Sequence, residues 1–209
     1  MLESRENAVA WLREPSDALR GPFAACGDCD RPRCREGIEH ALSNGAWGLC
    51  VTLTVFRLGK HAYRAQLFGG QGGLFASGRW TPRGRPVVYA SASISLAMLE
   101  YTVNYRRRGW VPATVLGRAT IPSGVRVQSV SSKDLPANWY AADAPTELQK
   151  VGGEWLERGE TAVLKVPSAI VVEEWNYLLN PLHADFRKLR FGAPKVFNFD
   201  RRVARSRTR

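Results

Sequence analysis

Long apolar runs are missing from this chain, and no stretch is long enough to cross a membrane as a helix. The first residues carry Glu3, Arg5 and Glu6 without an apolar segment behind them, so no secretory signal peptide is visible. We therefore expect a cytoplasmic protein without membrane contact, in which cysteine thiols stay reduced.

Acidic residues are scarce relative to basic ones. The chain has 19 Asp and Glu against 30 Lys and Arg, which gives a formal net charge of +11. Such an excess suits an anionic partner, such as a dinucleotide, an acidic protein or a nucleic acid. A solvated, Arg-rich surface would explain it equally well. At 209 residues and 44% hydrophobic content, the chain is long and apolar enough for one domain with an extension.

Histidine and cysteine are also few, which limits metal chemistry. Residues 1–50 are rich in Cys and Arg, show little periodicity, and read as an appended arm or as sequence upstream of the natural start. They contain all four cysteines: Cys26, Cys29, Cys34 and Cys50. The C-x2-C-x4-C spacing, followed by His40, resembles part of a zinc knuckle, but a second clean ligand pair is missing. We favour unliganded thiols and predict no metal.

A G-x-G-x-x-G fingerprint between a strand and a helix is absent, so we do not predict a Rossmann fold. Instead, a Gly-rich loop ends at Arg79, a short strand over 86–90 carries Tyr89, and a helix over 93–105 carries Glu100. Glycine allows close backbone approach, and an Arg fork binds phosphate or carboxylate. A lone carboxylate in an otherwise apolar helix suggests a function.

The helix over 93–105 has two candidate N-caps, Ser91 and Ser93. Its apolar residues at helical spacing predict one buried face: Leu96, Leu99 and Val103. Glu100 would lie beside this face, and contact with a nearby Arg could neutralise it.

Short strands are indicated over 51–58, 116–121, 124–130, 161–166 and 195–200, with a helical turn near Glu147 and a short helix over 152–159. The fourth strand delivers Ser168. Beyond it, Glu173 and Glu174 read as surface charges. Asn176 and Asn180 are four residues apart, so on a helical turn they would share a face. There they could hold the Ser168 loop or a ribose hydroxyl.

Several motifs in fixed order resemble those of the RES-domain family. In this chain they lie at 78–80 (GRW), 87–91 (VVYAS), 96–100 (LAMLE), 152–155 (GGEW), 166–168 (VPS), 176–186 (NYLLNPLHADF) and 199–202 (FDRR). The resemblance covers residues 51–203, and the combination is far more specific than any single motif. It divides the chain into an extension over 1–50, a RES domain over 51–203 and a basic tail over 204–209.

The resemblance implies an α+β fold, with a compact ADP-ribosyltransferase-like core of mixed sheet and surrounding helices. It also implies a bacterial toxin that consumes NAD+ and is neutralised by an Xre-type antitoxin. DNA would be reached only indirectly, through that antitoxin.

The same resemblance implies a site built from Arg79, Tyr89, Glu100 and Ser168. Glu100 would supply the anion near C1 of the nicotinamide ribose, and Arg79 would clamp phosphate. Tyr89 would orient the ribose, and Ser168 would hydrogen-bond on the nicotinamide side or position the acceptor. Further residues are expected to bind the dinucleotide: Arg57, Tyr63, Asn176 and Asn180.

Cleavage of the nicotinamide–ribose bond, by hydrolysis or phosphorolysis, is the function that we predict. A protein ADP-ribosyltransferase usually carries a second carboxylate near the first, and no Glu lies within three residues of Glu100. This favours NAD+ consumption over protein modification, which remains an alternative. A different class of alternative is an inactive RES-fold protein whose basic surface binds nucleic acid.

Overall fold

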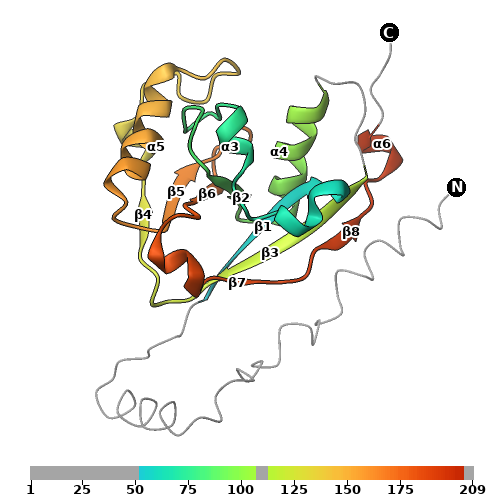
Figure 1. The fold of residues 1–209 in the computed structure, drawn as a ribbon. Coiled ribbons are helices and arrows are strands. Elements are labelled where there is room, and N and C mark those ends of the chain that lie inside the picture. Colours follow the sequence, from blue (N-terminus) through green and yellow to red (C-terminus); the bar gives the residue numbers. More distant parts are fainter. Residues whose placement is uncertain (1–51, 107–112, 205–209) are drawn as a thin grey trace, which may run out of the picture. The chain divides into compact units, whose positions relative to one another are not determined.

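The computed structural model describes residues 52–106 and 113–204 (Figure 1). The four cysteines, His40 and residues 205–209 of the basic tail lie outside these ranges. Within them, no group of three His, Cys, Asp or Glu residues is placed to hold a metal ion. None of the helices in the described ranges has the length and hydropathy needed to cross a membrane.

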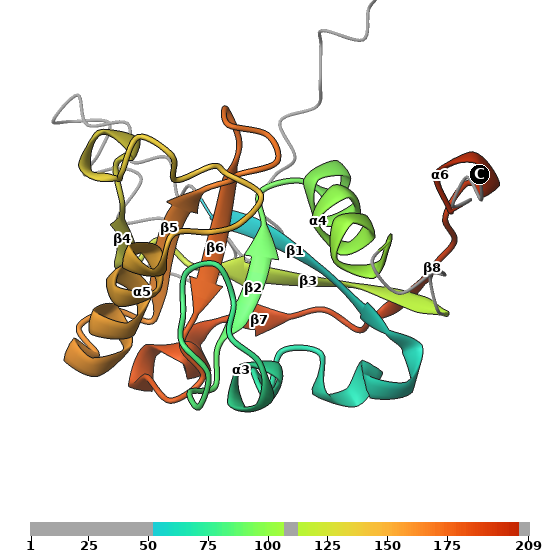
Figure 2. The same ribbon diagram turned by 90° about the horizontal axis from the view of Figure 1, so that it is seen from above.

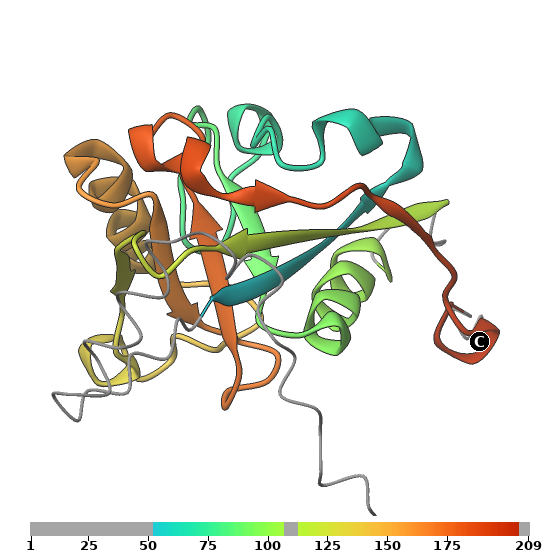
Figure 3. The ribbon, with the colours of Figure 1, turned by 90° about the horizontal axis from the view of Figure 1, so that it is seen from below.

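An eight-stranded mixed sheet organises the described residues. Its strands are β1 (Leu53–Lys60), β2 (Val88–Ser91), β3 (Thr114–Ile121), β4 (Val127–Ser129), β5 (Val163–Pro167), β6 (Trp175–Leu179), β7 (Arg190–Phe191) and β8 (Lys195–Phe197). Their order is β4-β5-β6-β2-β1-β3-β7, with β8 also paired to β3. Only the β4–β5 pair is parallel. Figure 3 shows the segment of β7 and β8 running along β3. The predicted α+β class with a mixed sheet is confirmed.

Two longer helices pack on this sheet, and Figure 2 shows them on either side of β2. They are α4 (Ile94–Arg106) and α5 (Thr146–Arg158). The shorter helices are α3 (Gly72–Phe75), α6 (Arg201–Ala204), η2 (His61–Gln66), η3 (Ser132–Asp134) and η4 (Ala184–Lys188). The predicted strands and the helix over 93–105 are thus found close to their expected places.

Helix α5 begins earlier than the sequence indicated. The expected turn near Glu147 and the expected helix over 152–159 form one continuous helix, which ends at Gly159 with a left-handed φ of 57°. Leu148 and Trp155 face the core with Trp80. Gly152 lies directly against the Trp80 carbonyl, so the missing side chain lets the helix approach the main chain.

Helix α4 buries a different face from the predicted one. Ser93 caps it, since the Leu96 N–H donates to Ser93 Oγ over 3.0 Å. Leu96 is fully buried, but Leu99 and Val103 are 37% and 49% exposed. The prediction of one buried face was wrong because α4 packs on β1 through Ala97 and Tyr101. These two side chains project from a different side of the helix than Leu99 and Val103.

The interpretation of Asn176 and Asn180 as neighbours on a helical turn was also wrong. Asn176 lies within β6, and Asn180 follows that strand. Four residues of extended chain separate their Cα atoms by about 13 Å. They therefore cannot contact one small group together.

Candidate active site

Four strands place their residues in one row beside α4. In the sheet register, Phe56 of β1 is opposite Ser91 of β2, and Ser91 is opposite Asn176 of β6. Asn176 is in turn opposite Val166 of β5, two residues before Ser168. Helix α4 begins directly after β2, so the chain returns over this row and brings Glu100 to Asn176 and Ser168.

The Glu100 carboxylate is held through one of its two oxygens. Asn176 Nδ2 donates to Glu100 Oε1 over 2.6 Å, and Ser168 Oγ donates to the same oxygen over 3.0 Å. Glu100 Oε2 accepts no hydrogen bond from the described residues. The side chain is half-buried. The carboxylate therefore has a fixed orientation and one oxygen available to a ligand.

The donors to Glu100 are themselves oriented by their neighbours. Ser91 Oγ donates to Asn176 Oδ1 over 2.8 Å, which leaves the amide nitrogen of Asn176 to face Glu100. Ser168 Oγ accepts the backbone N–H groups of Ile170 and Val171 over 3.1 and 3.2 Å, so its own proton is directed at Glu100. The neighbouring hydrogen bonds thus leave Asn176 and Ser168 one orientation each, in which both donate to Glu100.

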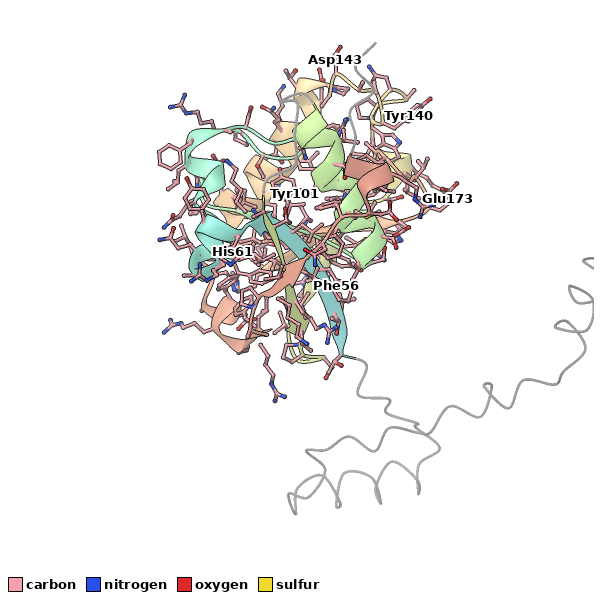
Figure 4. The ribbon with its side chains drawn as sticks, turned by 90° about the vertical axis from the view of Figure 1, so that its right-hand side faces the viewer. Phe56, His61, Tyr101, Tyr140, Asp143 and Glu173 are labelled. Atoms are coloured by element: carbon pink, nitrogen blue, oxygen red, sulfur yellow. The ribbon has the colours of Figure 1, made fainter. Side chains whose placement is uncertain are left out.

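Arg79 is anchored by the loop between η3 and α5. Its Nη1 donates to the Trp139 carbonyl and its Nη2 to the Ala141 carbonyl, each over 2.9 Å. The residue between these carbonyls, Tyr140, is exposed at the margin of the molecule (Figure 4). Burial lowers the pKa of Arg79, and the charge of Glu100 partly offsets that effect.

Arg79 and Glu100 form no direct ion pair with each other. Their charges interact, yet no ion pair within 4.0 Å joins them in the described part of the chain. The alternative that Glu100 is neutralised by direct contact with an Arg is therefore not observed among these residues.

Tyr89 supports the turn that carries Arg79. Its hydroxyl accepts the Trp80 N–H over 3.3 Å and shares a 2.8 Å hydrogen bond with Thr81 Oγ1. A Cβ at Gly78 would lie within 2.3 Å of this hydroxyl, so only glycine fits there. Burial raises the pKa of Tyr89 to about 12, and the hydrogen bonds oppose that shift. The neutral phenol is the form that the fold accommodates.

The remaining residues predicted to bind the dinucleotide have other partners than Glu100. Arg57 is half-buried, and its Nη1 donates to the Tyr89 carbonyl over 2.6 Å, which links it to the site through the backbone of β2. Tyr63 lies in η2, is 62% exposed and has Lys60 Nζ 5.9 Å from its ring centre. Asn180 Oδ1 accepts the Leu182 N–H in a turn after β6. Within the described ranges, neither Tyr63 nor Asn180 hydrogen-bonds to Glu100 or to its donors Asn176 and Ser168.

Sequence reasoning missed several residues that build the site. Ser91 was considered only as a helix cap, and Thr81 was given no role in the site. Gln149, whose Nε2 donates to the Gly78 carbonyl over 3.2 Å, was not noticed. The carbonyls of Trp139 and Ala141 have no sequence signal, because every residue has a carbonyl.

Comparison with known protein families shows which family this chain belongs to. The sequence model of one protein family, described as "RES domain", matches residues 54–200 of this chain. The chain belongs to the RES-domain family of toxins. A relative named Toxin Res from Yersinia enterocolitica is 33% identical over 152 residues, which cover 72% of this chain and 99% of the relative.

A second relative of this RES-domain toxin is named Prs ADP-ribosylating toxin, from Sphingobium sp.. It is 31% identical over 159 residues, which cover 74% of this chain and 99% of the relative. A solved structure, the MbcT–MbcA toxin–antitoxin complex of M. tuberculosis, matches with a TM-score of 0.59. The match covers 71% of this chain and 85% of that chain at 17% identity, so it shows a shared fold.

Proposed function

We propose that this RES-domain toxin cleaves the bond between nicotinamide and ribose in NAD+. The observation that carries the proposal is the Glu100 carboxylate, with two hydrogen bonds on Oε1 and none from the described residues on Oε2. Breaking this bond develops positive charge at C1 of the ribose, as in glycoside cleavage, where a carboxylate stabilises an oxocarbenium-like state. Glu100 Oε2 is the atom suited to that task.

In this proposal, the two hydrogen bonds to Glu100 contribute to catalysis. Nicotinamide leaves as a neutral group, so the reaction needs no general acid for it. It needs a negative charge whose position does not change while positive charge develops, and preorganised charge is usually the largest catalytic contribution. Asn176 and Ser168 provide that preorganisation, because both donate to the same oxygen.

Arg79 would bind the pyrophosphate of NAD+. Two of its five N–H donors are used by carbonyls, which fix the plane of the guanidinium and leave other donors for phosphate oxygens. Tyr89 keeps the turn with Arg79 in place through its hydroxyl, and its partly accessible ring can orient the nicotinamide ribose. Arg57 supports this strand. Tyr63 and Asn180 take no part in this version of the site.

The group that accepts the ADP-ribosyl moiety after nicotinamide leaves defines the reaction. Water would give hydrolysis and phosphate would give phosphorolysis, and these are the outcomes that we propose. The name of the Sphingobium relative favours a second candidate, ADP-ribosyl transfer to a protein. Mass spectrometry of the products distinguishes free ADP-ribose, its 1-phosphate and a modified protein.

An antitoxin is the proposed protein partner. The structural neighbour is a toxin solved with its antitoxin, and relatives carry the name Toxin Res. We propose an Xre-type antitoxin, through which the toxin would reach DNA, and a cytoplasmic location where both NAD+ and that partner are present. A neighbouring gene product that fails to co-purify with the toxin or to suppress its toxicity would contradict this pairing.

NAD+ remaining after incubation with purified protein tests the proposal. Glu100→Gln keeps the shape of the side chain and removes its charge, so we expect the rate of NAD+ loss to fall by about 100-fold or more. Glu173→Gln makes the same change at an exposed residue and should leave the rate unchanged. Wild-type turnover by Glu100→Gln would contradict the assignment, and dependence of the rate on added phosphate would identify phosphorolysis.

A further inference from the structure

Glu174 differs from its neighbour Glu173, although the sequence predicted surface charges for both. Glu173 is exposed at the outer margin of the molecule (Figure 4). Glu174 is half-buried, and its Oε2 accepts a hydrogen bond from Ser93 Oγ over 2.8 Å. The prediction for Glu174 was therefore wrong, because the fold brings the start of α4 against the β5–β6 connection.

The hydrogen bond between Ser93 and Glu174 reaches the first turn of α4. Ser93 Oγ accepts the Leu96 N–H over 3.0 Å, so its single proton is free to go to Glu174. The two contacts form one chain from the carboxylate through the cap to the helix backbone. A negative charge at a helix N-terminus is also electrostatically favourable.

The same connection holds Ser168, which donates to Glu100. The Ser168 N–H donates to the Glu174 carbonyl over 3.0 Å, and the Glu174 N–H donates to the Val171 carbonyl over 2.9 Å. Helix α4 is thus attached to the β5–β6 hairpin at two points: Ser93 with Glu174, and Glu100 with Ser168 and Asn176. Seven residues of helix separate these points by about 10 Å along the axis.

We propose that Glu174 is a positioning residue that sets the axial place and rotation of α4, and through α4 the direction of Glu100 Oε2. The inference rests on the proposed function of Glu100. Burial of Leu96, Ala97 and Tyr101 already packs α4 on the sheet. Apolar packing has little directional preference, so the bond between Ser93 and Glu174 adds the directional contact that fixes the axial place of the first turn. Displacements of about 1 Å from a productive geometry can cost about 100-fold in rate.

Kinetics on three variants test this proposal. Glu174→Ala removes the acceptor for Ser93, so kcat for NAD+ cleavage should fall about tenfold or more. KM should change less than about twofold, because the proposed pyrophosphate ligand, Arg79, lies on neither α4 nor the hairpin. Glu174→Gln keeps an oxygen acceptor and should recover most of kcat. Glu173→Ala is the matched control and should behave as wild type, with all melting temperatures measured in parallel.

Amide hydrogen exchange provides a readout that does not depend on NAD+. Exchange in the first turns of α4 should be faster in Glu174→Ala than in wild type and in Glu173→Ala. Wild-type kcat in Glu174→Ala, or failure of Glu174→Gln to recover it, would overturn the positioning role. If wild type itself leaves NAD+ intact, the proposed function fails, and unchanged exchange in α4 would then separately refute the two-point attachment.

Discussion

Single side chains set the direction of each hydrogen bond in the candidate site. A serine hydroxyl has one proton to donate. Ser91 donates it to the side-chain oxygen of Asn176, and Ser168 donates its proton to Glu100. The amide nitrogen of Asn176 then donates to Glu100 over 2.6 Å. Charge-assisted hydrogen bonds of this kind are stronger than neutral ones, so the carboxylate is well ordered before substrate binds.

Tyr89 leads to a prediction about stability at high pH. Its pKa is raised to about 12 in the folded protein, whereas tyrosine in an unfolded chain titrates near 10. The folded state therefore keeps a proton that the unfolded state loses, and stability is full below pH 10 and falls toward pH 12. The expected loss is at most about 1.4 kcal/mol per pH unit.

Urea unfolding at pH 9 and pH 11 measures this loss. Tyr89→Phe has no proton to lose at this position, so its stability should fall less between the two pH values than that of wild type. Tyr177, whose pKa burial also raises, is present in both proteins and cancels in the comparison. Equal pH dependence in the two proteins would contradict the prediction.

At the scale of elements, close approach of α5 to the Gly78–Thr81 turn depends on one glycine. A Cβ on Gly152 would lie 2.0 Å from the Trp80 carbonyl oxygen, which is backbone and cannot move away alone. A Cβ on Gly153 would lie 3.4 Å from Pro82, which is ordinary contact. The two adjacent glycines of one helix therefore form a natural pair of test positions.

Gly152→Ala should destabilise the protein by about 1–3 kcal/mol, since α5 must move away from Trp80. Gly153→Ala should be neutral or stabilising by up to about 1 kcal/mol, because alanine is the better helix former. Denaturant titration of both variants gives the comparison. Because the same turn carries Arg79, Gly152→Ala should also slow NAD+ loss, and equal stability of the two variants would refute this account of the helix contact.

On the scale of the whole molecule, the family match over residues 54–200 contains all of the described sheet except Leu53, the first residue of β1. The Yersinia relative aligns over 99% of its own length to 152 residues of this chain, and the family match begins at residue 54. All strands from β1 to β8 lie within residues 53–197. The part of the chain needed for folding is therefore expected to begin near Val51.

A chain beginning at Val51 should unfold in one cooperative transition and consume NAD+ at a rate within about threefold of the full chain, because two-state unfolding is usual for one domain of this size. Calorimetry and the NAD+ assay test both statements. Loss of the cooperative transition would contradict the domain boundary. Binding of nucleic acid probes at low salt, without loss of NAD+, would instead support the nucleic-acid alternative.

The sequence by itself determined the family, the mixed α and β class and the main candidate residues. Arg79, Tyr89, Glu100 and Ser168 stand in short motifs, and local patterns of apolar residues placed the strands and helix α4 close to where they are found. These properties are local, because they depend on residues within a few positions of each other. A single sequence displays such patterns directly.

Only the tertiary structure decided which residues meet. The bonds to Glu100 join residues 68 and 76 positions apart, and the bond between Ser93 and Glu174 spans 81 positions. The same holds for the carbonyls that anchor Arg79, about 60 positions away, which no residue type can signal. Such contacts depend on strand order and register, and these follow from the packing of the whole sheet rather than from any local pattern.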